Sequence, residues 1–352
     1  MRITWRQVTR WRAVRQLLTT GEPDPVEVAR RVGGIHAQVA SCSTGIAALR
    51  GATGVDDALA DRTLVRTWAM RGTLHLLPAD ELGLWCAALT ERESRRRFPP
   101  SFERENGVDG DTLHAVTASI GRVLGAEPLT RAELVERVVD DLGRPEIAEA
   151  MGKGWGVLLK PAAARGYLCS GPDGTFVSPA GLLGRPLDQH DPAEAEQAAL
   201  TRFLAANGPV TVEDVARWWG EQPAPARRRL RGAERVGVEI DGEPGFLLDP
   251  ADADELAATP ADGDHPADGP FLLPGFDPWT IAPLSHRRHA VPEGREKEVS
   301  RAAGWITPVL VVDGRVAGVW EREGGRIVVR PFAKLPAGAR RAVERLGEVG
   351  WA

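Results

Sequence analysis

The stretch PVTVEDVARWWGEQPAPARRRLRGAERVGVEIDGEPGFLL, residues 209–248, decides the fold. Its first part, Pro209–Val215, opens a short helix, and helical spacing predicts a second helix over Ala224–Arg235. Two strands follow around the turn that begins at Asp241-Gly242, over Val236–Ile240 and Phe246–Leu248. A helix, a turn, a second helix and a hairpin are the order of a winged helix.

A similar order occurs earlier in the chain. Leu129–Leu134 opens a short capped helix, and Gly156–Arg165 is expected to form the second helix. A hairpin then follows, with Gly166–Cys169 and Thr175–Val177 on either side of a Gly-Pro-Asp-Gly turn. Asp24–Leu77 fits the same plan more loosely, so the sequence predicts three winged-helix units in tandem.

The residues before the second unit show helical spacing over most of their length. The predicted helices are Thr4–Thr19, Asp24–Val32 with Asp24 as N-cap and Pro25 in the first position, Ser43–Leu49, Ala58–Trp68 and Asp80–Arg97. Arg71–Pro78 reads as a strand that a proline ends.

The composition of the last third of the chain changes twice. Residues 249–268 are acidic and rich in Pro, Gly and Ala, and we expect a solvated loop or linker there. Four strands follow, over Phe271–Pro274, Trp305–Val312, Arg315–Trp320 and Arg326–Pro331, with a tight turn at Asp313-Gly314 and a final helix over Gly338–Leu346. These elements predict a small antiparallel sheet or barrel.

The sequence therefore predicts an α+β protein with three tandem winged-helix units and a small C-terminal β-barrel. The expected segments are 1–125 (first winged-helix unit with flanking helices), 126–190 (second unit), 191–250 (third unit), 251–270 (acidic linker or loop) and 271–352 (barrel and terminal helix). A chain of 352 residues is long enough for two or three domains.

The amino-acid composition limits the classes of protein to which the chain can belong. An apolar fraction of 43% and a charged fraction of 26% are typical of a soluble globular chain. No apolar run approaches the length of a membrane span and the N-terminus is not a signal peptide, so we expect a cytoplasmic protein without a membrane partner. The three cysteines, Cys42, Cys86 and Cys169, are far apart and suggest neither a disulfide framework nor a zinc site.

The charge distribution leaves room for a nucleic-acid partner. The net charge is −5, but residues 249–268 carry seven Asp and Glu and no Lys or Arg, so the rest of the chain would stand at +2. Arginine supplies nearly all the positive charge, and arginine suits phosphate recognition and stacking on bases. A GC-rich genome would also enrich arginine, so the arginine content fits both a nucleic-acid-binding protein and a protein encoded by such a genome.

A short motif, Gly33-Gly34-Ile35-His36-Ala37-Gln38, is the candidate catalytic centre. The two glycines allow the backbone to end a helix and begin an extended segment, in which residues two apart share one side. An imidazole and a carboxamide side by side can orient a water molecule, and the imidazole can accept its proton. The alternative is a buried His36 and Gln38 that are hydrogen-bonded at a helix end.

Basic residues on the predicted second helices are candidate DNA contacts. They are Lys160 and Arg165 in one unit, and Arg228 and Arg229 within a run of arginines in the other. Such residues contact phosphates and fix the register of a complex without reading its sequence. The alternative for each is a solvated helix face.

Two further sites carry chemistry-bearing residues. His286-Arg287-Arg288-His289 could offer two metal ligands, but no third ligand lies at a recognisable spacing, so we favour a basic loop near DNA. Asp277, in Pro274-Gly275-Phe276-Asp277-Pro278-Trp279, is either a helix cap or turn residue or a support of the active centre. The sequence contains no Walker loop, dinucleotide fingerprint or HExxH motif, and we expect neither a metal nor a cofactor.

Three motifs together resemble those of the AlkZ/YcaQ-type winged-helix DNA glycosylases. They are Gly34–Gln38, Arg66–His75 and Leu272–Asp277, and the likeness spans nearly the whole chain. In that family, three winged helices and a C-terminal β-barrel form a concave DNA cradle. Its catalytic signature is Gln-Φ-Gln or Gln-Φ-Asp, where Φ is aliphatic. Here the signature reads His36-Ala37-Gln38, which resembles the His-Φ-Gln branch associated with self-resistance to intercalating guanine alkylators of the hedamycin type.

The resemblance implies hydrolysis of the N-glycosidic bond of N7-alkylated purines in double-stranded DNA. Gln38 would orient the water, and His36 would orient it or accept its proton. We expect the enzyme to be a monomer. No lysine lies near the motif, so a monofunctional glycosylase is expected. Arg71, Arg287 and Arg288 are the further expected DNA contacts. The alternative is a non-enzymatic winged-helix transcriptional regulator, in which His36 and Gln38 would have no role.

Overall fold

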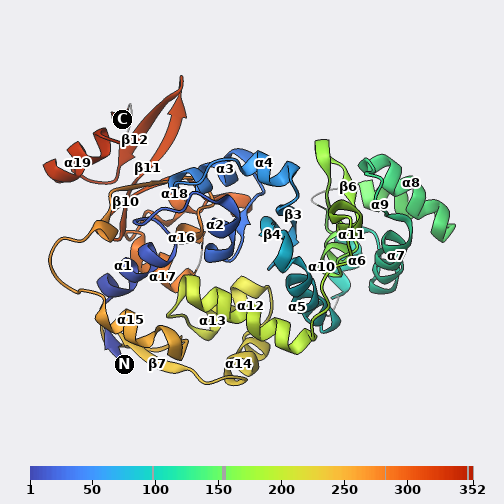
Figure 1. Ribbon diagram of the computed structural model, residues 1–352, viewed down its shortest axis with the longest axis horizontal. Coiled ribbons are helices and arrows are strands. Elements are labelled where there is room, and N and C mark those ends of the chain that lie inside the picture. The colour runs from blue at the N-terminus through green and yellow to red at the C-terminus, as the bar shows by residue number, and fades with distance from the viewer. Residues whose placement is uncertain (97–98, 153–155, 282, 347–348, 352) are drawn as a thin grey trace. The chain divides into compact units, whose positions relative to one another are not determined.

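The computed structural model describes residues 1–96, 99–152, 156–281, 283–346 and 349–351, and the chain forms two compact units (Figure 1). Unit 1 contains Met1–Val55 and Leu200–Ala352, and unit 2 contains Asp56–Ala199. In the described part of the chain, no helix is long and apolar enough to cross a membrane. The division of the sequence into five segments stays a prediction.

The structure contains the helices and the hairpin that were predicted for the third winged helix. Its elements are α12 (Pro192–Asn207), α13 (Val212–Trp219), α14 (Pro223–Arg231), β7 (Val236–Ile240) and β8 (Glu243–Leu248). Thr211 and Asp214 form a capping box that starts α13. The backbone of Val210 pairs with Leu247 on the hairpin, so the wing is tied to the start of the helix. The predicted second helix ends four residues early, at Arg231 before Gly232.

The second predicted winged helix repeats this pairing within unit 2. Its elements are α7 (Gly110–Val123), α8 (Arg131–Leu142), α9 (Ile147–Gly152), α10 (Lys160–Ala164), β5 (Cys169–Ser170) and β6 (Phe176–Val177). Thr130 and Glu133 form the capping box of α8, and Leu129 pairs with Phe176 as Val210 does with Leu247 in the third unit. The helix expected from Gly156 begins only at Lys160.

One helix prediction in unit 2 is wrong. The helix expected over Ala58–Trp68 is α4 (Val55–Ala60), and Leu64–Ala69 is strand β3, which pairs in antiparallel with β4 (Thr73–Pro78). Nearly every residue of β3 is buried, so the strand lacks the polar alternation that would have marked it in the sequence. The remaining helices of this unit are α5 (Leu82–Ser94), α6 (Pro100–Asn106) and α11 (Pro179–Leu183). Arg97, the predicted end of the helix from Asp80, lies outside the described residues.

The N-terminal part of unit 1 follows the prediction closely. Its elements are β1 (Arg2–Ile3), α1 (Trp5–Arg15), α2 (Pro25–Val32), β2 (Ile35–His36) and α3 (Ala40–Leu49). Asp24 caps α2 through the backbone N–H of Val26, with Pro25 in the first position. Val8 and Trp11 of α1 are buried, and β1 pairs in parallel with β7.

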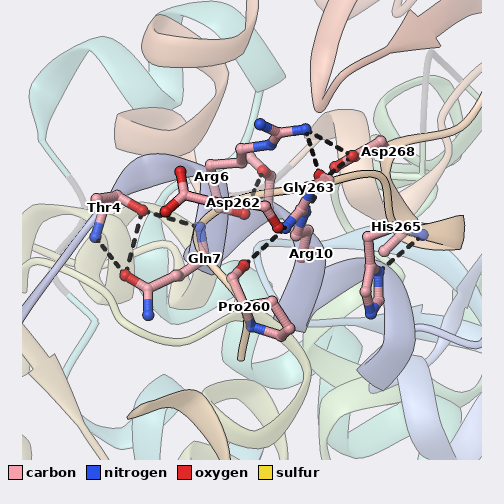
Figure 2. A network of polar contacts seen from close by, with 11 residues as sticks. Thr4, Arg6, Gln7, Arg10, Pro260, Asp262, Gly263, His265 and Asp268 are labelled. Atoms are coloured by element: carbon pink, nitrogen blue, oxygen red, sulfur yellow. Dashed lines mark hydrogen bonds and ion pairs between the residues drawn. The ribbon is translucent and has the colours of Figure 1, made fainter. Parts of the chain in front are cut away.

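The acidic segment, expected as a solvated loop or linker, is helical over its first half. It forms η3 (Pro250–Asp252), α15 (Ala253–Ala258) and η4 (Pro266–Asp268), and these elements pack along α1. Figure 2 shows how Arg6 and Arg10 of α1 reach Asp268 and the backbone carbonyls of Pro260, Asp262 and Gly263. Three of the seven acids, Asp252, Glu255 and Asp268, pair with arginines of α1 that lie 237 to 262 residues earlier in the chain. The composition of the segment does not reveal these distant partners.

Ion pairs fix this segment at both ends of α1. The Nη2 atom of Arg10 lies 2.6 Å from a carboxylate oxygen of Asp268. Arg15 binds Asp252 and Glu255, each at 2.9 Å. Burial opposes ionisation of Asp268, but the hydrogen bonds and charges of Arg10 and Arg6 outweigh it and lower its pKa to about 2.

The C-terminal strands form one five-stranded sheet in the order β13-β12-β11-β10-β9. The strands are β9 (Phe271–Leu273), β10 (Val309–Val312), β11 (Arg315–Glu323), β12 (Arg326–Pro331) and β13 (Val349–Trp351), and α19 spans Ala337–Glu344. Asp313 and Gly314 both have positive φ, as the predicted tight turn requires. The first part of the strand expected over Trp305–Val312 is irregular, and the parallel strand β13 was not predicted. A closed barrel stays a prediction.

Candidate active site

The His36 motif begins where two glycines end helix α2. Gly33 (φ 72°) and Gly34 (φ 101°) adopt conformations that favour glycine, and the N–H of Gly34 donates to the carbonyl of Ala29 at 2.7 Å. The chain then becomes extended at β2, as the sequence predicted. Helix α3 starts four residues after His36, so the motif is a short extended link between two helices.

The two polar side chains of the motif differ in accessibility. His36 is buried, with 4% of its surface exposed, whereas Gln38 is half-buried. The backbone N–H of Gln38 points at Nδ1 of His36 at 3.5 Å, a long contact in which the imidazole accepts. In the neutral tautomer that suits this contact, Nε2 carries the proton. Gln38 is therefore the more accessible partner, and its backbone orients the His36 ring.

The His36 ring lies flat against Phe276. The ring centroids are 4.6 Å apart and the ring planes differ by 4°. Phe276 is buried and has a φ of 59°, a left-handed conformation that is rare and costly for a bulky residue. Residues held in such conformations cluster at functional sites. Phe276 lies within a motif noted in the sequence, but no role was predicted for it. The Gly275-Phe276-Asp277-Pro278 turn was the signal that could have identified it.

Asp277 holds this turn in place from inside the protein. Its carboxylate accepts two hydrogen bonds from Arg50, at 2.8 and 3.0 Å, and one from the N–H of Trp279 at the start of α16 (Pro278–Ile281). Both side chains of the ion pair are fully buried. Arg50 also donates to the carbonyls of Gln16 and Ile46. Asp277 is thus a helix cap and the partner of a buried arginine, and it supports the site indirectly, through Phe276.

Close backbone packing also sets the position of this turn. A Cβ atom on Gly275 would lie 3.0 Å from the carbonyl oxygen of Ile306, and one on Gly45 of α3 would lie 3.4 Å from Cβ of Pro274. The His36 motif, the turn around Phe276 and the segment before β10 therefore meet at one place in unit 1.

Known proteins resemble this chain over nearly its whole length. Residues 29–349 match the model of the family described as DNA glycosylase AlkZ-like. The chain belongs to the AlkZ-like DNA glycosylase family. It is 37% identical to an interstrand DNA cross-link repair glycosylase of Streptomyces sahachiroi, over 98% of this chain and 95% of that protein. Its structure is similar to that of the Streptomyces sahachiroi DNA glycosylase AlkZ, with a TM-score of 0.88, 36% identity and the same shares of the two chains covered.

Family membership makes the protein a DNA glycosylase with damaged DNA as its substrate, and the alternative of a non-enzymatic regulator is set aside. The resemblance that the three sequence motifs suggested is thereby confirmed at the level of the AlkZ-like family. Its finer part, the His-Φ-Gln branch, rests on the sequence of the motif alone.

In this AlkZ-like glycosylase, the histidines of the His286–His289 motif serve packing. The segment is helix α17 (Leu284–Ala290) and not the basic loop that we expected. His286 is 2% exposed and donates from Nε2 to the carbonyl of Pro209 at 2.6 Å, while His289 stacks on Trp5 with centroids 4.5 Å apart. Burial, and then the charge of Arg12, holds the pKa of His286 well below its ordinary value. A neutral, buried His286 does not fit the predicted role in DNA binding.

The two arginines of the His286–His289 motif remain compatible with DNA contact. Arg288 is exposed and Arg287 is half-buried. Among the residues that the structure describes, no group of three His, Cys, Asp or Glu side chains could hold a metal ion.

The two predicted DNA contacts on helix α14 also differ in exposure. Arg228 is exposed, whereas Arg229 is 6% exposed, pairs with Glu221 at 2.6 Å and lies over the ring of Trp219. Arg229 therefore joins α14 to α13, and its burial contradicts the prediction that it contacts DNA.

In unit 2, two of the predicted contacts lie side by side. Arg71 is exposed in the turn between β3 and β4, not on the strand that was predicted to begin there. The side chain of Lys160 packs over Gly72, where a Cβ atom would meet its Cδ at 3.1 Å. Burial, and then the charges of Arg96 and Arg92, lowers the pKa of Lys160. Arg165, at the end of α10, is exposed.

Proposed function

We propose that this glycosylase hydrolyses the N-glycosidic bond of bulky N7-alkylguanine nucleotides in duplex DNA. The observation that carries the proposal is the His36-Ala37-Gln38 segment, extended and backed by a strained Phe276, at the position of the family's catalytic signature. Its relative from Streptomyces sahachiroi is an interstrand cross-link repair glycosylase, so cross-linked guanines are included in the proposed substrate class.

Excision of an N7-alkylated base requires few catalytic groups from the protein. Alkylation at N7 makes guanine cationic, so the base leaves as a neutral molecule when the bond between C1′ and N9 breaks. A water molecule then has to be held against C1′ while positive charge develops on the sugar. The water loses a proton as the new C–O bond forms, and a nearby acceptor takes that proton.

We assign the positioning of water to Gln38, because it is the more accessible member of the pair. His36 acts beside it, with its ring orientation fixed by Phe276 and by the N–H of Gln38. When Nδ1 accepts that N–H, Nε2 carries the proton and can donate to water. To act as the base, His36 must use an unprotonated nitrogen, so this role requires the other tautomer or the loss of the 3.5 Å contact.

The proposed phosphate contacts are the basic residues that stay accessible. We retain Arg71, Lys160, Arg165, Arg228, Arg287 and Arg288, and we remove His286 and Arg229 because they are buried. Each retained residue would neutralise a phosphate without reading sequence. Loss of one such contact should flatten the dependence of log K on log salt concentration by about one unit.

One gel assay tests the proposal. Duplex oligonucleotides that carry one bulky N7-alkylguanine, one N7-methylguanine or an N7–N7 cross-link are incubated with the protein and then heated with or without alkali. Strand breaks that require alkali and exceed those of an identically treated sample without protein show abasic sites and a monofunctional glycosylase, whereas protein-dependent breaks without alkali show a lyase. An intact bulky-adduct duplex, together with cleavage of N7-methylguanine, would overturn the proposed substrate class.

We further propose that the biological role is self-resistance to, or repair after, a genotoxic alkylating natural product. Expression of the protein in a sensitive bacterium should raise survival on an intercalating N7-guanine alkylator. A variant with both His36→Ala and Gln38→Ala should give no protection at equal protein level. Equal protection by the variant would point to sequestration of the damage instead of excision.

A further inference from the structure

A tryptophan is exposed next to the ring that supports His36. Trp305 has 43% of its surface exposed, and its ring centroid lies 5.1 Å from that of Phe276 with the ring planes at 77°. Phe276 in turn stacks on His36. Three aromatic rings therefore lead from the buried imidazole of the catalytic motif to an indole at the surface. A large aromatic surface left in water is costly and is a common feature of binding sites.

The backbone around Trp305 is built to present this side chain. Ala303 (φ 55°) and Gly304 (φ 76°) form a tight turn in which the N–H of Arg301 donates to the carbonyl of Trp305 at 2.8 Å. Ser300 pairs with Ile306 across the base of the turn, and Ile306 is buried. The residue after the tryptophan is thus anchored, while the tryptophan itself stays at the surface.

The close packing of Gly275 links this turn to the active site. Because a Cβ atom on Gly275 would lie only 3.0 Å from the carbonyl oxygen of Ile306, the two segments approach at backbone distance. Trp305 and Phe276 therefore share one support, and the position of the indole relative to His36 is fixed by backbone packing.

We propose that Trp305 is a substrate-binding residue that stacks on a planar aromatic ring of the damaged nucleotide while His36 and Gln38 act at the sugar. The inference rests on the proposed function and extends it by naming the residue that senses the ring. The ring comes either from the alkylating group or from a nucleobase, since both offer a flat π surface. Stacking of one base on an aromatic side chain corresponds to about 5- to 150-fold in affinity.

The test uses Trp305→Ala and Trp305→Phe in the full chain. Turnover and equilibrium binding are measured on duplexes with a polycyclic aromatic N7-guanine adduct, with N7-methylguanine and with no damage. Tyr167→Ala is the matched control, because Tyr167 is another exposed aromatic residue and lies in unit 2. Thermal melting checks that each variant is folded.

We expect Trp305→Ala to raise KM on the polycyclic adduct about 10- to 100-fold with little change in kcat, and Trp305→Phe to restore most of the loss. An effect confined to the polycyclic adduct would assign the ring to the alkylating group. An equal, phenylalanine-rescued effect on N7-methylguanine would assign it to the nucleobase.

Three results would overturn the inference. They are unchanged binding and turnover in Trp305→Ala, an equal loss in Trp305→Ala and Trp305→Phe, and an equal loss on undamaged DNA. Failure of the proposed function would look different, because the wild-type protein would then bind the adduct duplex without releasing the base. In that case the binding measurements alone still test the stacking.

Discussion

The His36 segment and helix α17 both place histidines in short polar motifs of unit 1, yet the structure gives them opposite surroundings. His36 lies on a strained phenylalanine and next to a half-buried glutamine that can meet a substrate. His286 and His289 pack around Trp5, and Nε2 of His286 donates to the backbone carbonyl of Pro209. A histidine motif acquires a function from the groups that face it, and these come from distant parts of the chain.

This difference predicts separate outcomes for the two regions. Changes at the His36 segment should lower activity while the protein stays folded, because we propose that this segment contacts the substrate. Changes at α17 should alter stability and its pH dependence, because His286 is buried and His289 stacks on Trp5. Changes at Arg50 and Asp277 should affect both stability and activity, since this ion pair holds the turn that carries Phe276.

The largest effect is expected from Arg50→Met, which leaves Asp277 charged and buried without its partner. Removal of one member of a buried ion pair costs about 3–5 kcal/mol in the free energy of unfolding. Urea denaturation measures this loss. The double variant Arg50→Met/Asp277→Asn removes the orphan charge and keeps a side chain able to cap α16, so it should recover part of the stability.

Phe276 connects this stability effect to activity. If the ion pair positions the turn, the double variant should fold but remain a weaker glycosylase than the wild type, because His36 loses part of its support. Full activity in the folded double variant would show that Asp277 acts only as a structural residue.

The next effect is on catalysis. Gln38→Ala removes the group that we assign to water, and loss of one positioned hydrogen-bonding group in an active site costs about 10²–10³-fold in rate. Single-turnover base release should fall by that factor, while the melting temperature changes little because Gln38 is half-buried. A large drop in the melting temperature would move Gln38 from the active site into the fold.

His36 is tested by two replacements. His36→Gln writes the Gln-Φ-Gln signature of the family into this chain and should keep part of the activity, whereas His36→Ala should lose most of it. If His36 accepts the proton of water, wild-type activity falls at acid pH and the glutamine variant lacks this limb. Superimposable pH profiles would exclude His36 as the base.

Local sequence signals predicted much of this structure. The caps Asp24, Thr130 and Thr211 start the expected helices, and the glycines before His36 end α2 where the sequence places them. Such features depend on hydrogen bonds between residues a few positions apart. They are therefore readable from one sequence.

The features that were missed depend on distant parts of the chain. The acidic segment was misread because its partners are the arginines of α1, and β3 was misread because it is buried on both sides. The support of His36 by Phe276 joins residues 240 positions apart, with a φ that local sequence does not favour. The extended conformation of the His36 segment could thus be predicted, but its surroundings could not.

A smaller expected effect is the pH dependence of the free energy of unfolding, to which α17 contributes. Burial keeps His286 neutral in the folded protein, whereas in the unfolded chain it takes up a proton below its ordinary pKa of about 6.5. The unfolded state then binds more protons, so stability falls with decreasing pH, by at most about 1.4 kcal/mol per pH unit for this one group. Urea titrations between pH 7 and 5 should show the decline, and His286→Gln should flatten it. An unchanged slope in that variant would mean that His286 titrates alike in both states.

The acidic segment contributes a last, separate step at lower pH. Because Arg10 and Arg6 lower the pKa of Asp268 to about 2, the folded state keeps this carboxylate ionised where the unfolded chain, with a pKa near 3.9, has begun to protonate it. Its stabilisation, about 2 kcal/mol, is present above pH 4 and is lost between about pH 4 and 2. Asp268→Asn should remove this step and leave the slope between pH 7 and 5 unchanged, since that slope comes from the histidines of α17 and from His75, whose pKa values burial lowers. If Asp268→Asn altered both regions, the acidic segment and α17 would titrate as one coupled network, and packing in unit 1 could not be divided as we have done.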